Sequence, residues 1–316
     1  MAKKVLAAIA MTIGGIATFA TVAAFFGGFW WGFDLLANYR WQAMWAAMIA
    51  SVLYAFFGKG LFTAIFVVAV AINMWLILPA WIGGQPDATG EGIIRITHAD
   101  LSGTLTDVDE TVTWLVTADA DVLLIADPPA VVVAAISAAD PTYELLNPGT
   151  ASGGVAVFTR GNRVMATRTD QSGAPVYRIT VPSETGVVDV ITARGPMATS
   201  SSTSEELANR FAAIADTVNA SDNPAVVIGN LGATKWSVVS RDLLGVTALR
   251  DATEGSGYLS TWPTSDLPII GRWIGIPIDV AYMDPELTPL DVIVGPNIGA
   301  EHLPMTIDVS PAERKS

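Results

Sequence analysis

The chain contains no cysteine and only two histidines among its 316 residues. Without cysteine it can form neither disulfide bonds nor thiolate metal sites, and it lacks the ligands of an iron–sulfur cluster. A chain of this length can bury a sufficient hydrophobic core without such crosslinks. We therefore expect a fold that is held together by packing, and no electron transfer by this chain.

Positive charge is also scarce, since 17 Lys and Arg residues stand against 30 Asp and Glu residues. The imbalance is confined to the C-terminal part: residues 1–84 carry a net charge of +3, whereas residues 85–316 carry −16. A domain with so much negative charge repels the phosphate backbone of DNA and RNA. We therefore expect no nucleic-acid partner.

The first 84 residues are dominated by three apolar runs, over 5–26, 41–57 and 61–81. Each run is about long enough to cross the hydrocarbon core of a bilayer as a helix, the second only just. The two lysines ahead of the first run would also fit a signal peptide, but two further apolar runs follow it. The pattern predicts a three-helix transmembrane anchor over 1–84.

Basic residues near the ends of these runs set the orientation of the anchor. Lys3 and Lys4 indicate a cytoplasmic N-terminus, and Lys59, between the second and third runs, marks a second cytoplasmic contact. Three crossings then place everything after Trp81 outside the cytoplasm. We expect an integral, multi-pass membrane protein in contact with lipid, with a cytoplasmic N-terminus and an extracytoplasmic C-terminal domain.

A turn-rich linker over 85–91 leads to a domain over 92–316, in which short apolar strands and amphipathic helices follow one another. Strands that pair in succession between two stretches of helix are typical of two packed sheets. The expected fold class is α+β, a three-helix transmembrane anchor followed by a four-layer α/β sandwich. Strands are predicted over 92–97, 121–126, 151–159, 176–181, 187–192, 225–229, 278–282, 292–294 and 305–309, and helices over 106–118, 128–138, 204–218 and 236–244.

The order and spacing of these segments resemble a known family. The anchor pattern, with Phe33-Asp34-Leu35 after its first run, and the outer segments from about Arg95 to Val309 are similar to a membrane-anchored branch of the endonuclease/exonuclease/phosphatase superfamily. That branch includes glycopeptide-resistance proteins with three N-terminal helices. The resemblance implies the same sandwich fold, and hydrolysis of phosphoesters by a divalent metal, a His–Asp pair and Asn donors.

The residues at the implied site positions depart from the pattern of that family. Asp100 stands where the resemblance implies an Asn, Asp127 where it implies a metal-binding Glu, and Ala193 where it implies a His. Asn230 and Gly232 occupy the positions of the Asp and Asn in a Gly-Asp-x-Asn turn. Alanine cannot supply an imidazole, glycine cannot donate a side-chain hydrogen bond, and an amide cannot act as a carboxylate base.

Three further positions keep part of the pattern. Asp279 is retained from an Ile-Asp-His motif, and Glu301 and His302 correspond to a terminal Ser-Asp-His. Asp279 and His302 would then keep a structural hydrogen bond across two strands, while the other acids line a solvated pocket. The resemblance thus implies a phosphoesterase fold with a degenerate active site, which binds no cofactor.

From this we expect that the chain is not an enzyme, but a catalytically inactive accessory or structural subunit of a larger membrane protein complex, such as a respiratory one. Its partners would be membrane lipid and other integral membrane proteins. One alternative is a metal-dependent phosphoesterase that acts on a phosphoester at the outer membrane surface, with Mg²⁺ or Ca²⁺ bound by Asp100, Asp127 and Glu301. Another is a module that binds a phosphorylated lipid without cleaving it, supported by Arg194 and Lys235.

Overall fold

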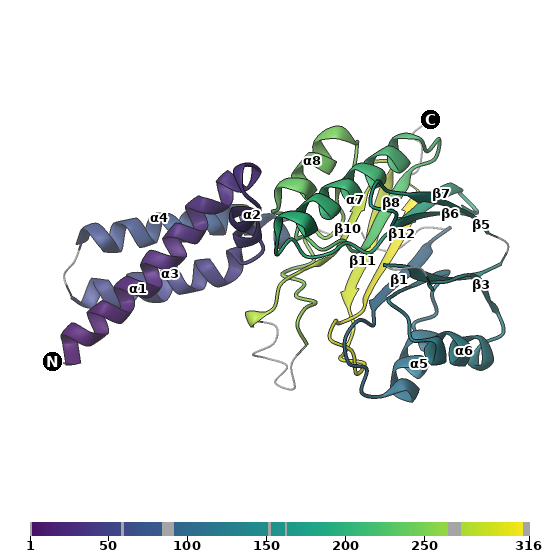
Figure 1. Ribbon diagram of the computed structural model, residues 1–316, viewed down its shortest axis with the longest axis horizontal. Helices are drawn as coiled ribbons and strands as arrows, with labels where there is room; N and C mark the ends of the chain where they lie inside the picture. The colour runs from purple at the N-terminus through teal and green to yellow at the C-terminus, as the bar shows by residue number, and fades with distance from the viewer. Residues whose placement is uncertain are drawn as a thin grey trace.

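The computed structural model describes residues 2–57, 60–83, 92–150, 153–161, 163–264 and 273–311. It has two parts, a helical bundle and a two-sheet domain, which lie end to end along the long axis of the molecule (Figure 1). The linker predicted over 85–91 lies outside the described residues.

The bundle consists of three helices that lie side by side, α1 (Ala2–Ala23), α3 (Arg40–Phe56) and α4 (Gly60–Ile77). Short helical segments extend their ends towards the domain: η1 (Ala24–Phe29), α2 (Trp31–Ala37) and η2 (Leu78–Ala80). Small residues allow the helices to approach closely. Gly14 packs directly against the ring of Phe66, which a Cβ atom would overlap. Several alanines are buried in the same interface: Ala10, Ala17, Ala47, Ala50 and Ala69.

The three predicted apolar runs all form helices, but among the described residues only two helical stretches are long and apolar enough to cross a membrane, Lys3–Phe29 and Gly60–Ala80. The prediction of three membrane-spanning helices is wrong in this count. Helix α3 has 17 residues and begins with Arg40. At about 1.5 Å per residue it falls short of the roughly 30 Å hydrocarbon core of a bilayer.

The domain contains two six-stranded sheets. The first has the spatial order β11-β12-β1-β2-β4-β3 and the second the order β5-β6-β7-β8-β10-β9. The strands of the first sheet are β1 (Ile94–Asp100), β2 (Val122–Ala126), β3 (Tyr143–Pro148), β4 (Val155–Arg160), β11 (Leu287–Val294) and β12 (Met305–Pro311). Those of the second are β5 (Val164–Thr169), β6 (Pro175–Ser183), β7 (Gly186–Thr192), β8 (Ala225–Asn230), β9 (Arg250–Asp251) and β10 (Asp279–Met283).

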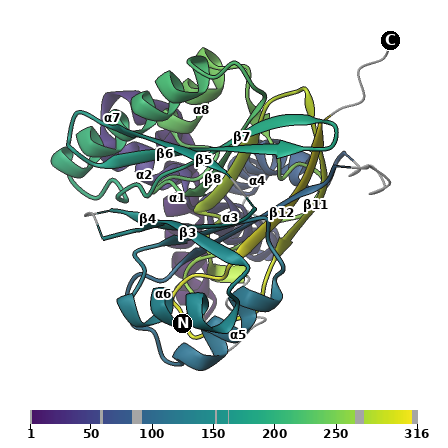
Figure 2. The same ribbon diagram turned by 90° about the vertical axis from the view of Figure 1, so that its right-hand side faces the viewer.

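Helices cover the outer face of each sheet (Figure 2). Helices α5 (Val108–Thr117) and α6 (Ala130–Ala139) cover the first sheet, and α7 (Ser201–Asn219) and α8 (Val238–Val246) cover the second. Strand β2 shows how the layers form, because all its residues are buried and its side chains alternate between two cores. Leu124 packs between the two sheets, whereas Leu123 and Ile125 pack beneath α5 and α6. The fold is therefore a two-sheet α+β domain.

The bundle contacts the end of the domain at which β8 leads into α8. The Asp34 side chain of α2 accepts a hydrogen bond from Val238 N at the start of α8, at 2.7 Å. The buried Asn38 side chain accepts two hydrogen bonds from Thr234, from its backbone N at 3.1 Å and its Oγ1 at 2.9 Å. The indole of Trp236 donates to a backbone carbonyl of α4 at 3.1 Å. The loop after β8 is thus fixed to the bundle.

Candidate functional site

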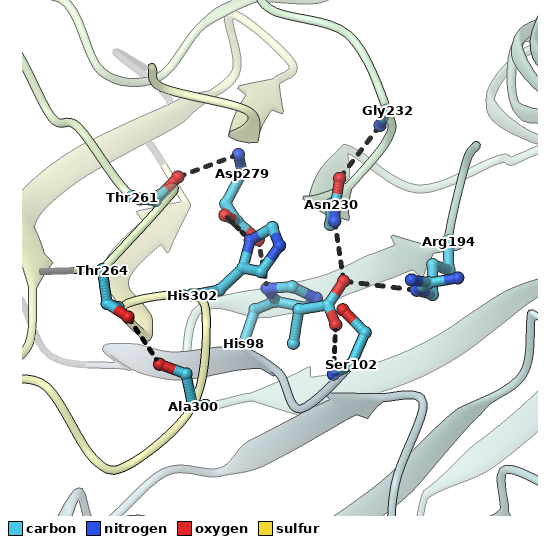
Figure 3. A network of polar contacts seen from close by, with 11 residues as sticks. His98, Ser102, Arg194, Asn230, Gly232, Thr261, Thr264, Asp279, Ala300 and His302 are labelled. Carbon is cyan, nitrogen blue, oxygen red and sulfur yellow. Dashed lines mark hydrogen bonds and ion pairs between the residues drawn. The ribbon is translucent and has the colours of Figure 1, made fainter. Parts of the chain in front are cut away.

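Polar side chains gather where strands of the two sheets end (Figure 3). This end of the domain faces the bundle, since Ala80 and Asp279 line one pocket. Asp100 ends β1 of the first sheet, and His98 lies two residues before it, on the same face of the strand. Asn230 ends β8 and Asp279 begins β10, where the two residues are paired in register. His302 lies just ahead of β12. Strand ends therefore bring together residues that are far apart in the sequence.

One carboxylate is shared by both histidines of the chain. His302 Nδ1 lies 2.9 Å from one oxygen of Asp279, and His98 Nδ1 lies 3.4 Å from the other. All three side chains are almost fully buried, with 6%, 1% and 1% exposure for His302, His98 and Asp279. Nδ1 of each ring therefore faces the same carboxylate.

The two imidazoles differ in basicity. Burial favours the neutral form of both rings. At His98 burial prevails and lowers the pKa below its usual value. At His302 burial also acts to lower the pKa, but the Asp279 carboxylate outweighs it, so that the pKa of His302 is raised. His302 is therefore the more basic of the two imidazoles, and it is the one hydrogen-bonded to the buried Asp279 carboxylate.

A second network is built around Asp100. Its carboxylate accepts hydrogen bonds from Ser102 N at 2.8 Å and from Asn230 Nδ2 at 2.7 Å, and Arg194 Nε lies 3.3 Å away. Burial acts to raise the pKa of Asp100, but the nearby charges of His302 and Arg194 and the bonds from Ser102 outweigh it and lower the pKa. Asp100 is therefore an ionised carboxylate with both oxygens paired.

The two predicted positions that lack functional side chains are tightly constrained. Gly232 has φ +80, and a Cβ atom there would overlap the carbonyl oxygen of Pro196. Its backbone N donates instead to Asn230 Oδ1 at 3.1 Å. Ala193 is fully buried in the hydrophobic core between the second sheet and its helices, directly before Arg194. Backbone geometry thus leaves no room for a side chain at Gly232, and Ala193 is part of the packed core.

Asp127 and Glu301 lie apart from these networks. Both are exposed; Asp127 has φ +51 directly after β2, and Glu301 accepts a hydrogen bond from Thr104 N at 3.4 Å. Within the described ranges, no three His, Asp or Glu side chains come together in a group that could hold a metal ion. The predicted ligands Asp100, Asp127 and Glu301 therefore do not fit a common Mg²⁺ or Ca²⁺ ion, which needs about six oxygen ligands.

The site predicted from the sequence did not include His98. Arg194 and Lys235 were considered only as support for phosphate binding. A signal for His98 was present, because it is one of two histidines and lies at the two-residue strand period from Asp100. Arg194 does contact the site through Asp100. Lys235 is paired with Asp251 at 2.6 Å.

Comparison with known proteins agrees with this geometry. Residues 73–307, well over half of the chain, match the endonuclease/exonuclease/phosphatase family, and the chain belongs to that family. No curated protein sequence matches the chain.

Many solved structures share the fold. The endonuclease/exonuclease/phosphatase of Beutenbergia cavernae is 15% identical with a TM-score of 0.52, over 70% of this chain and 72% of that one. TDP2 of D. rerio, in complex with a single-strand DNA product, is 13% identical with a TM-score of 0.55, over 69% of this chain and 99% of that one. The 3′ phosphatase NExo from Neisseria, bound to a product DNA hairpin, is 17% identical with a TM-score of 0.51, over 69% and 99%.

These findings correct the expectation that the chain is not an enzyme. That expectation rested on single site positions at which the residue differs from the one that the family resemblance implies. The family to which the chain belongs is one of endonucleases, exonucleases and phosphatases, and similar structures include a named 3′ phosphatase and complexes with reaction products. The fold is that of enzymes, and the buried His302–Asp279 pair lies within it.

Proposed function

We propose that this protein is a membrane-anchored phosphoester hydrolase whose substrate lies at the outer surface of the membrane. The observation that carries the proposal is the His302–Asp279 pair, placed beside Asp100, Asn230 and Arg194 at the end of the domain that faces the bundle. A proton-exchanging imidazole next to a cationic side chain is one arrangement that supports phosphoester hydrolysis, because it provides a base and offsets phosphoryl charge.

In the proposed reaction, His302 Nε2 accepts a proton from a water molecule as the water oxygen attacks phosphorus. Asp279 holds the ring through Nδ1 and stabilises the imidazolium that forms. The bond between phosphorus and the ester oxygen then breaks, the departing oxygen takes a proton from solvent water, and His302 returns its proton to the solvent. Arg194 and the free amide hydrogen of Asn230 offset negative charge on the phosphoryl oxygens.

Exposed apolar side chains support the membrane anchor. On the long helical stretches, Ile16 and Phe19 of α1 are 64% and 61% exposed, and Leu61 and Trp75 of α4 are 72% and 76% exposed. Helices of a soluble core would bury such residues, whereas lipid-facing helices expose them. We place the N-terminus in the cytoplasm and the two-sheet domain outside it. Reporter fusions after residue 84 that are active only in the cytoplasm would contradict this orientation.

The position of the site favours a substrate that is itself held by the membrane. A pocket beside the site is lined both by Ala80, at the end of the bundle, and by Asp279, together with Lys235 and Tyr258. The loop from Asn230 to α8 is fixed to the bundle as well. We therefore propose a lipid-linked phosphoester as substrate. The net charge of −16 on residues 85–316 disfavours a nucleic acid.

The test is hydrolysis by the full-length protein in lipid nanodiscs, with a phosphodiester on a lipid and the same phosphodiester on a soluble alcohol. The proposal expects release of the product from the lipid-borne ester, and much slower release from the soluble one. Equal rates would contradict a preference for membrane-borne substrates. No release from either ester would contradict the proposed hydrolysis. Membership of a larger membrane complex stays a prediction, which co-purification from mild detergent tests.

A further inference from the structure

Arg194 occupies the place in the site where positive charge is needed. It directly follows the buried Ala193 after β7, so its backbone is fixed in the core. Its Nε lies 3.3 Å from Asp100 Oδ2, yet the side chain is 27% exposed, whereas that of Asp100 is 0% exposed. The guanidinium therefore pairs with the buried acid on one side and remains accessible on the other.

A divalent cation would compete with this arrangement. To be bound by Asp100, it would have to lie among the donors from Ser102 and Asn230 and against the Arg194 guanidinium. Repulsion between the two cations and the lack of further ligands both act against such binding. The positive charge that balances the Asp100 carboxylate is thus supplied by Arg194.

Arg194 also lines a pocket of about 310 Å³ that lies beside the acid–base pair, since neither Asp279 nor His302 is among its lining residues. Arg210 lines the same pocket; it is 3% exposed and pairs with Asp170 through Nε at 2.9 Å, while its Nη1 has no partner within the described part of the chain. Glu206 lies exposed in the same lining. Two guanidinium groups beside one pocket suit a phosphate group, which arginine can bind through paired N–H donors.

We propose that Arg194 replaces the metal ion, so that the site binds a phosphate group, of an ester or free, without any divalent cation. This inference rests on the proposed phosphoester function and deepens it. Arg194 contacts the phosphoryl oxygens, and Arg210 lines the same pocket as a second guanidinium.

The test is calorimetric titration of the full-length protein in detergent with inorganic phosphate, in EDTA and then with Mg²⁺ or Mn²⁺. Phosphate should bind in EDTA, and added metal should change the affinity by less than about twofold. Arg194→Gln should weaken phosphate binding by at least about tenfold, because a charge-assisted hydrogen bond is lost. Arg194→Lys keeps the charge but loses the paired donors, and should bind phosphate with intermediate affinity.

Arg178→Gln is the matched control. Arg178 is 31% exposed and faces a buried Asp189 at 3.9 Å, in the same sheet but outside the site, so its removal should leave phosphate binding unchanged. Thermal unfolding of each variant separates loss of binding from loss of fold, and Arg194→Lys decides the matter if Arg194→Gln does not fold.

Phosphate binding that requires Mg²⁺, or an Arg194→Gln variant that binds like the wild type, would overturn the inference. Hydrolysis is measured in the same samples, which keeps the two proposals distinguishable. Hydrolysis that depends on metal and not on Arg194 contradicts only the inference. Phosphate binding in EDTA without hydrolysis under any condition contradicts only the proposed function.

Discussion

At the scale of single residues, the site depends on how one buried carboxylate changes the pKa values of two imidazoles. Asp279 lies between His98 and His302, and the balance between burial and attraction differs at the two rings. Removal of that carboxylate should therefore lower the pKa of both rings, because attraction by Asp279 acts to raise each of them.

Because the chain has only two histidines, their titration can be followed directly by NMR of protein with labelled imidazoles. One resonance should titrate above the ordinary pKa of 6.5 and the other below it. In Asp279→Asn, the pKa of His302 should fall below 6.5. Two rings that titrate together near 6.5 in the wild type would contradict the geometry of the pair.

The raised pKa of His302 also makes the stability of the fold depend on pH. The folded state binds a proton at His302 more tightly than the unfolded state does, since the pKa of His302 is raised in the folded state. Its contribution to the free energy of unfolding is therefore fully present below about pH 6.5 and is lost as the pH rises through the folded-state pKa.

Gly232 permits a second test at the residue scale. Gly232→Asn places the side chain implied by the resemblance where a Cβ atom overlaps the carbonyl oxygen of Pro196, at a positive φ. We expect a loss of at least about 2 kcal/mol in stability, seen as a lower thermal midpoint. Gly245→Asn is the control, because a Cβ atom there meets nothing within 4 Å. Equal midpoints for the two variants would refute the steric argument.

At the scale of elements, the sequence predicts best those strands that are buried on both faces. β2 and β8 are continuous apolar runs and were predicted within a residue of their bounds. The strands β3 and β5 were missed, because both pair with a single neighbour at a sheet edge and β5 is mostly exposed, so neither shows an apolar pattern. Helix α7 begins earlier than predicted, because Ser200 rather than Ser204 forms the capping box.

The segment around α2 gives a prediction at this scale. Asn38 is 4% exposed and accepts two hydrogen bonds from Thr234, so Asn38→Ala leaves the Thr234 backbone N–H and hydroxyl buried without a partner. We expect a loss of about 1–3 kcal/mol, and faster proteolysis of the loop between β8 and α8. Asn219→Ala removes one bond at an exposed side chain, to Val246 O at 3.3 Å, and should have little effect. Similar proteolysis of both variants would argue against a fixed junction.

At the scale of the whole molecule, the sequence predicts the two-sheet α+β fold, because hydrophobic pattern and segment order determine it. It could not give the count of membrane-spanning helices, since α3 is apolar but short. It also could not give the pairing of Arg194 with Asp100 or of His98 with Asp279, because these contacts join strands of different sheets. The error about enzyme activity has this cause: single positions were judged before their neighbours in space were known.

The central claim is that this two-sheet domain hydrolyses a phosphoester at the membrane through His302. The most direct measurement compares turnover of a lipid-borne phosphodiester by wild-type protein and by His302→Asn, in the same nanodiscs and at the same protein concentration. The account predicts turnover by the wild type and a loss of about 10²–10⁴-fold in His302→Asn, the usual contribution of a general acid–base group. No turnover by the folded wild type, or equal turnover by the two proteins, would contradict it.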